Sequence, residues 1–121
     1  MENLPQKIKD LALILSSAKL RYSTEAELQE EIARLLTHYH IPFQREYVLS
    51  AANRIDFLIM GAIGVEIKIK GQPLEIYRQV ERYAKFDKIK AILLVTTFRM
   101  GFPSQIENKP AAMVNLSRGW L

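Results

Sequence analysis

The amino-acid sequence predicts an α/β fold in which helices flank a central mixed β-sheet. Apolar residues repeat with the period of a helix before residue 40, alternate with polar residues between 43 and 69, and run continuously from Ala91 to Thr97. The continuous run is typical of a strand buried on both faces of a sheet. Because the chain has 121 residues, 49% hydrophobic and 25% charged, we expect a single domain spanning residues 1–121.

Two helices are predicted in the first third of the chain. Pro5 suits the first turn of a helix, where its missing N–H costs little. The apolar stripe that follows it consists of Ile8, Leu11, Leu15 and Leu20. Ser23-Thr24 supplies a cap for the second helix, which ends before Pro42. The stripe of this second helix consists of Leu28, Ile32, Leu35, Leu36 and Tyr39.

The rest of the chain is predicted to form strands around one more helix. We expect a strand at Phe43–Leu49, a turn at 50–53, two strands within Ile55–Ile69 around Gly61, a helix over about 73–86, and strands at 91–97 and 112–116. The predicted order is therefore α, α, β, β, β, α, β, β.

Composition and charge exclude several classes of site. The chain has no cysteine, so disulfides and thiolate-bound metals are excluded and a metal must be held by carboxylates. His38 and His40 are interpreted as surface or capping groups. No apolar run reaches the roughly 18 residues of a membrane span, and we expect a cytoplasmic protein. Residues 61–121 carry ten basic and five acidic side chains, net +5, which suits a surface that meets phosphates.

Candidate chemistry lies in the hairpin around Gly61. If the loop is Met60-Gly61-Ala62, residues whose numbers sum to 122 face each other, and Asp56 lies opposite Glu66. Alternation then makes one face apolar, with Ile55, Phe57, Ile59, Val65, Ile67 and Ile69. The other face is charged and holds Arg54, Asp56, Glu66, Lys68 and Lys70.

This register opposes like charges across the ladder, which is destabilising unless a ligand compensates. Two carboxylates with Cβ atoms about 5 Å apart suit a hard divalent cation such as Mg²⁺. Lys68 shares their face, two residues after Glu66. The alternative is a charged solvent face in another register.

These residues resemble the motif of the PD-(D/E)XK nuclease superfamily, in which Asp56 and Glu66-Ile67-Lys68 correspond to the motif and Ile55-Asp56 replaces Pro-Asp. Residues 25–29, Glu-Ala-Glu-Leu-Gln, are similar to the first-helix signature of its virus-type replication-repair (VRR-NUC) and Holliday-junction-resolvase-like branches, where a glutamate helps to bind metal. We choose Glu25 because it lies three and seven residues before the core positions of that helix. The alternative is a carboxylate favoured by the helix dipole.

Residues 79–83, Gln-Val-Glu-Arg-Tyr, resemble the Gln-x-x-x-Tyr element of exonuclease branches. Gln79 and Tyr83 lie one turn apart and would touch substrate or brace the catalytic strand. The alternative is a packed helix with Tyr83 in the core. The resemblance covers about 24–97 and implies a restriction-endonuclease-like fold, an αβββαβ core preceded by an extra N-terminal helix within 1–22.

The resemblance further implies a metal-dependent nuclease that hydrolyses phosphodiester bonds with little sequence specificity. DNA is the expected substrate. Asp56, Glu66, Glu25 and the main-chain carbonyl of Ile67 would hold Mg²⁺ or Mn²⁺, and Lys68 would orient the attacking water. The candidate contacts to backbone phosphates are Arg54, Lys70, Arg78, Arg82 and Arg99.

Three other functions stay open. The chain is alternatively a nucleic-acid-binding module without cleavage, a nuclease subunit that requires a partner, or a small interaction protein whose charged hairpin is coincidental. Self-association as a homodimer also stays open, and no membrane partner is expected.

Overall fold

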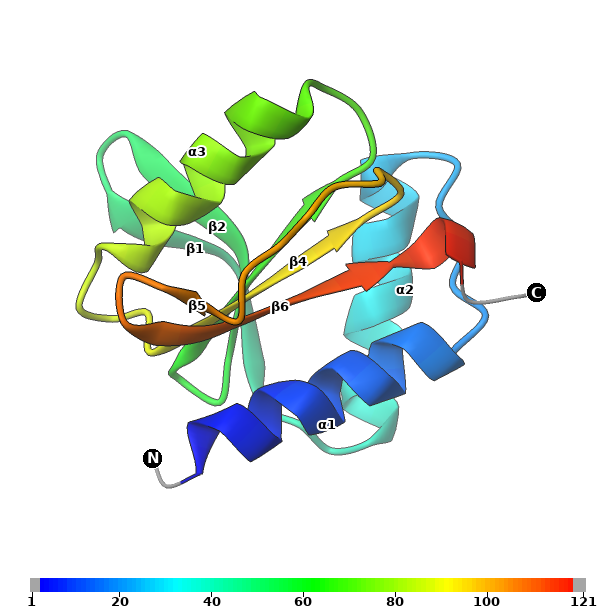
Figure 1. The fold of residues 1–121 in the computed structure, drawn as a ribbon. Helices are drawn as coiled ribbons and strands as arrows, with labels where there is room; N and C mark the ends of the chain where they lie inside the picture. Colours follow the sequence, from blue (N-terminus) through cyan, green and yellow to red (C-terminus); the bar gives the residue numbers. More distant parts are fainter. Residues whose placement is uncertain (1–2, 119–121) are drawn as a thin grey trace.

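The computed structural model describes residues 3–118, which form three α-helices and a six-stranded mixed sheet (Figure 1). The helices are α1 (Leu4–Ser17), α2 (Glu25–His38) and α3 (Pro73–Ala84). The strands are β1 (Phe43–Ser50), β2 (Asn53–Ile59), β3 (Ile63–Lys68), β4 (Ala91–Thr96), β5 (Gln105–Ile106) and β6 (Lys109–Asn115), followed by a 3₁₀ turn at Leu116–Arg118. The predicted α/β class, a mixed sheet flanked by helices, is confirmed.

The sheet has the strand order β1-β2-β3-β4-β6-β5. Strands β1, β2 and β3 are antiparallel neighbours, β4 runs parallel to both β3 and β6, and β5 is antiparallel to β6. Helix α3 connects β3 to β4 across one face, while α1 and α2 cover the other (Figure 1). Because β3 and β4 are parallel, their last residues, Lys68 and Thr96, lie side by side at the C-terminal end of both strands.

Each face of the sheet has its own apolar core. The predicted stripes of the first two helices face one core and are buried at Ile8, Leu11, Leu15, Leu28, Ile32 and Leu36. The other core lies under α3 and includes Ile76 and Val80. Thr24 caps α2 as predicted, since its hydroxyl accepts a hydrogen bond from the N–H of Glu27 at 3.0 Å.

Four details of the predicted elements are wrong. Helix α1 ends at Ser17, and Leu20 packs against the core from the segment that follows it. Tyr39 is 52% exposed because it is the C-cap of α2, where the backbone leaves the helix.

Strand β6 begins at Lys109, before the predicted residue 112. Strand β5 was not expected, because its two residues leave no periodic pattern in the sequence. Its turn to β6, Glu107-Asn108, has positive φ at both positions (53° and 62°), which matches the twist of a hairpin.

The β2–β3 hairpin has the predicted register. Residues 57, 58 and 59 pair with 65, 64 and 63. Met60 and Gly61 both have positive φ, 52° and 66°, and the N–H of Ala62 donates to the carbonyl of Ile59 at 3.0 Å. This is the mirror-image turn that suits a twisted hairpin, and Gly61 adopts it without steric cost.

The side-chain alternation predicted for β2 fails at Ile55. Ile55 packs in the core under α3 together with Leu58, whereas Phe57 and Ile59 face the opposite core. Gly64, which lies opposite Leu58 and has no side chain, leaves room for Ile55 there. A methyl group on Gly64 would lie 2.7 Å from Cδ1 of Ile55. Ile55 therefore fills the space that this glycine leaves.

Candidate active site

Asp56 and Glu66 meet just beyond the last pair of the β2–β3 ladder. The N–H of Asp56 donates to Oε1 of Glu66 at 3.2 Å, and the N–H of Ile67 donates to Oδ2 of Asp56 at 2.8 Å. In an ordinary antiparallel ladder, main-chain carbonyls of the neighbouring strand accept such bonds. Here the two carboxyl groups accept them, so the side chains lie between the strands and interact with each other.

Both carboxyl groups are poorly solvated. The predicted charged face is covered by α3 at this point, and Glu66 is only 3% exposed. Burial, followed by the negative charge of Asp56, raises the pKa of Glu66 from 4.5 to about 9, and burial also raises the pKa of Asp56. The pair therefore retains a proton at neutral pH unless a cation replaces it.

Lys68 is the basic group beside this pair. Its Nζ lies 4.0 Å from Oε2 of Glu66, and its side chain is 27% exposed. Residues two apart on a strand share a face, which explains why the Lys68 ammonium reaches the carboxylate from the solvent side. The Lys68 charge opposes the rise in pKa of both carboxyl groups but is outweighed by burial.

Glu25 contacts the end of β3. Its Oε2 accepts a hydrogen bond from the N–H of Ile69 at 3.0 Å. The other glutamates of α2, namely Glu27, Glu30 and Glu31, bind groups within residues 21–45 instead. The helix-phase argument thus selected the glutamate that touches β3. Glu25 does not form a three-carboxylate cluster with Asp56 and Glu66, because residues 3–118 contain no group of three or more His, Asp or Glu side chains arranged to hold a metal.

Gln79 and Tyr83 brace β2 from α3. Nε2 of Gln79 donates to the Tyr83 hydroxyl at 2.9 Å, and that hydroxyl donates to the carbonyl of Arg54 at 3.0 Å. Burial, with the nearby negative charges of Glu66 and Asp56, raises the pKa of Tyr83 to about 12, so the hydroxyl keeps its proton. Tyr83 is a core residue, as the alternative interpretation expected, and its hydroxyl also fixes the strand two residues before Asp56.

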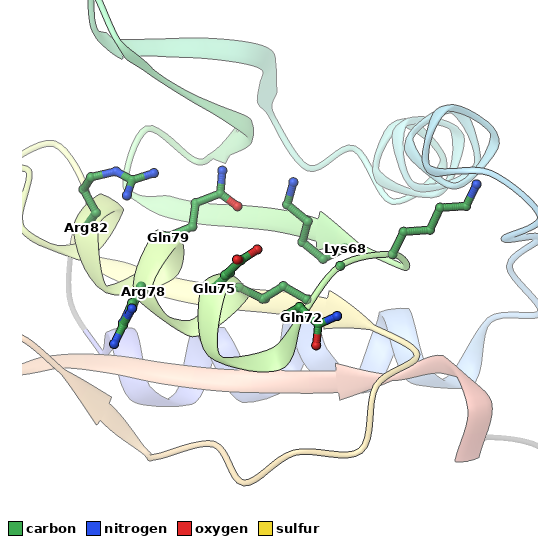
Figure 2. Close-up of a pocket in the computed structure, with 9 residues that line it drawn as sticks. Lys68, Gln72, Glu75, Arg78, Gln79 and Arg82 are labelled. Carbon is green, nitrogen blue, oxygen red and sulfur yellow. The ribbon is translucent and has the colours of Figure 1, made fainter.

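A cavity of ≈ 420 Å³ opens beside this site, between the end of β3 and α3. Its basic lining residues are Lys68, Lys70, Arg78 and Arg82. Figure 2 shows the side chains of Lys68, Gln79 and Arg82 pointing to the same side, whereas Arg78 points the opposite way. Three of the five predicted phosphate contacts, Lys70, Arg78 and Arg82, are therefore gathered around one cavity.

The two remaining candidate phosphate contacts lie elsewhere. Arg54 is exposed and pairs with Glu46, with 3.6 Å between Nε and Oε2. Arg99 is exposed in the segment after β4 and does not line the cavity. Because β4 is parallel to β3, Arg99 still follows a strand whose C-terminal end lies beside Lys68.

Sequence reasoning missed Asn53, Gln72 and Glu75. Gln72 and Glu75 line the cavity, and Oδ1 of Asn53 accepts a hydrogen bond from Nε of Arg82 at 2.9 Å. Asparagine is common in turns, so the residue type at position 53 predicts only a turn. No local pattern links Asn53 to Arg82, a helix residue 29 positions later. The glycine at position 71 was the one signal in the sequence, since glycine favours a bend; in the structure its φ of 118° lies just before α3.

The donor set fits a hard divalent cation. Asp56 and Glu66 present only oxygen atoms, the ligand type that Mg²⁺ and Mn²⁺ prefer, in a place where the two carboxyl groups otherwise retain a proton at neutral pH. The hydrogen bond observed at Ile67 uses its N–H group. The role of its carbonyl as a metal ligand stays a prediction.

Residues 3–118 contain no helix that is long and apolar enough to cross a membrane. The longest described helices, α1 and α2, have 14 residues each. In comparisons with family models, curated proteins and solved structures, the chain matches none of them.

Proposed function

We propose that this protein is a metal-dependent nuclease that hydrolyses phosphodiester bonds, with DNA as the first substrate to test. The observation that carries the proposal is the poorly solvated Asp56–Glu66 pair with the Lys68 ammonium 4.0 Å from Glu66, next to a cavity whose basic lining residues include Lys68. The proposal includes membership of the PD-(D/E)XK superfamily with its restriction-endonuclease-like fold. It is supported by the antiparallel β1-β2-β3 unit that carries Asp56, Glu66 and Lys68, followed by α3 and the parallel strand β4.

Each residue has a distinct task in the proposed reaction. Asp56 and Glu66 would hold Mg²⁺ or Mn²⁺, with the Ile67 carbonyl and Glu25 at the margin of the site. The metal supplies Lewis acidity and lowers the pKa of bound water. Lys68 orients the attacking water and offsets the negative charge that develops on the phosphoryl oxygens. Tyr83 and Gln79 keep β2 in place so that the Asp56 carboxylate stays beside Glu66.

The test is cleavage of labelled DNA in the presence and absence of Mg²⁺. A panel of linear, nicked, flapped and four-way DNA covers the substrate shapes that the sequence leaves open. We expect Mg²⁺-dependent cleavage by the wild-type protein and none by Asp56→Ala. Asp10→Ala is the matched control, because Asp10 is an exposed carboxylate on α1, across the sheet from the site. Binding of DNA without cleavage under any of these conditions would favour a non-catalytic binding module.

A further inference from the structure

The cavity beside Lys68 carries a strong excess of positive charge. Of its nine lining residues, four are Lys or Arg and one, Glu75, is acidic, which gives the lining a net charge of +3. Such a lining attracts phosphate groups. The cavity is adjacent to the carboxylate pair without including it, because Asp56 and Glu66 are absent from its lining.

Arg82 is held in a defined orientation at this cavity. Its Nε donates to Oδ1 of Asn53 at 2.9 Å, and its guanidinium carbon lies 5.9 Å from the centre of the Tyr83 ring. A guanidinium group is planar, so fixing Nε also fixes the directions of the two terminal nitrogens. The orientation of Arg82 therefore depends on Asn53, the first residue of β2, across the gap between α3 and the β1–β2 turn.

The other arginines near the site are placed differently. Arg54 is engaged by the carboxylate of Glu46, and Arg78 points away from Lys68 and Gln79 (Figure 2). Arg82 alone among these three has a neutral hydrogen-bond partner and the same direction as Lys68 within the described residues. It keeps its full charge for a ligand, at a low conformational-entropy cost.

We propose that the cavity binds a second phosphate group of the nucleic-acid strand, distinct from the phosphate that reacts at Asp56 and Glu66, and that Asn53 is the positioning residue for Arg82. This inference rests on the proposed nuclease function and names the part of the substrate that the cavity holds. The phosphate is an internal diester or a terminal monoester, since both present the same oxygens to the guanidinium. Binding there would set the distance between a fixed phosphate and the bond that is cut.

The test measures binding without cleavage. A short fluorescein-labelled DNA strand and its RNA counterpart are titrated in EDTA over a series of salt concentrations, with fluorescence anisotropy as the readout. Arg82→Gln should weaken binding about tenfold, the usual size of one lost charge-assisted contact, and should lower the log–log salt slope by about 0.7. Arg34→Gln is the matched control, because it removes an exposed arginine of α2 that does not line the cavity.

Asn53→Ala keeps every charge, so it should weaken binding about threefold and leave the salt slope unchanged. Its effect should disappear in the Arg82→Gln background, because a positioning residue acts only through the side chain that it positions. Ser50→Ala separates this role from stability of the turn. It removes the 3.0 Å hydrogen bond from Nδ2 of Asn53 to the Ser50 hydroxyl and leaves Oδ1 available to Arg82, so wild-type affinity is expected.

Strand chemistry identifies the source of the phosphate. Uncharged methylphosphonate linkages placed one at a time, and strands with or without a terminal phosphate, should reveal one position whose loss costs affinity in the wild type but not in Arg82→Gln. An internal position assigns the diester and a terminal one the monoester. Equal affinities of the wild type and Arg82→Gln, or an additive effect of Asn53→Ala, overturn the inference.

The nuclease proposal fails separately. Binding that depends on Arg82 as expected, without Mg²⁺-dependent cleavage, overturns the nuclease function and leaves the phosphate site. Mg²⁺-dependent cleavage by the wild type, together with unchanged DNA affinity in Arg82→Gln and Asn53→Ala, overturns the phosphate site and leaves the nuclease function. Failure of the wild type to bind either strand at low salt overturns both.

Discussion

The two halves of the β2–β3 hairpin share one register and differ in construction. Next to the turn, Phe57 and Ile59 pair with apolar partners on β3 through main-chain hydrogen bonds and are fully buried. One pair further on, the carboxyl groups of Asp56 and Glu66 take the place of main-chain acceptors. The apolar half holds the strands together, and the carboxylate half keeps two acidic groups in contact, which retain a shared proton at neutral pH. Stability and the proposed chemistry thus belong to adjacent segments of the same two strands.

The largest expected effect is on stability and comes from the apolar half. Phe57 is fully buried and forms an edge-to-face contact with Phe43, with ring centres 5.8 Å apart. Phe57→Ala should lower the free energy of unfolding by about 3 to 5 kcal/mol, because it leaves a cavity in the core. Urea denaturation followed by circular dichroism measures this. A loss under about 1 kcal/mol would show that the apolar half is not the part that stabilises the hairpin.

In the carboxylate half, the largest effect should fall on catalysis. Lys68→Ala should lower the rate of Mg²⁺-dependent cleavage by at least about a hundredfold, since its charge acts mainly on the transition state. Affinity for DNA measured in Ca²⁺ should stay within about tenfold of wild type. Lys85→Ala, at the far end of α3, is the control. Wild-type rates in Lys68→Ala would exclude Lys68 from the reaction.

The pH dependence of stability distinguishes the two halves next. The pKa of Glu66 is raised from 4.5 to about 9 in the folded protein, so between these values the folded state binds a proton that the unfolded state releases. Without metal, the free energy of unfolding should therefore fall as the pH rises from about 4.5 to about 9. Each unit of raised pKa corresponds to about 1.4 kcal/mol at full effect.

Glu66→Gln should flatten the pH dependence of the free energy of unfolding. Thermal melts in EDTA at about pH 5, 7 and 9 measure this change. Phe57→Ala is the useful contrast, because it should shift all melts downward and keep their slope. Parallel pH profiles of wild type and Glu66→Gln would contradict the burial of an ionisable Glu66.

The smallest effect concerns repulsion within the carboxylate pair. Above the pKa of Glu66, about 9, where both carboxyl groups are ionised, Asp56→Asn should stabilise the metal-free protein by roughly 0.2 to 1 kcal/mol, since an amide still accepts from Ile67 and no longer repels Glu66. Mg²⁺ at tenfold excess over its Kd should stabilise the wild type by about 1.4 kcal/mol, and this gain should shrink in Asp56→Asn. Thermal melts at matched ionic strength compare the two. A lower apo stability with an unchanged Mg²⁺ response would make Asp56 a structural residue.

The hairpin register was predictable because local signals agree on it. Gly61 marks the turn, and the pairing that opposes Phe57 and Ile59 to Val65 and Ile63 buries apolar residues on both strands. The stripe of α2 likewise selected, among four glutamates, the one that contacts Ile69 after β3, and its role as a metal ligand stays a prediction. Local periodicity thus determined these elements and two of the candidate site residues, Asp56 and Glu66, as neighbours.

Features that depend on distant residues were not predictable in this way. Ile55 leaves the expected face and packs in space that Gly64, nine residues later, leaves for it. The burial of Glu66 depends on where α3 packs, and the hydrogen bond between Asn53 and Arg82 joins a turn to a helix. No pattern in a single segment encodes such contacts, since each depends on how two segments are placed in space.

Strand β1 lies at the open edge of the sheet and has consequences for self-association. An edge strand offers unpaired main-chain groups to a strand of another molecule. In β1, however, Glu46 adopts a positive φ of 51° between the paired residues Arg45 and Tyr47, and residues 44–46 are exposed and polar or charged. A backbone turned in this way cannot present a straight row of donors and acceptors. Copies of this protein should therefore not assemble by extending the sheet at β1.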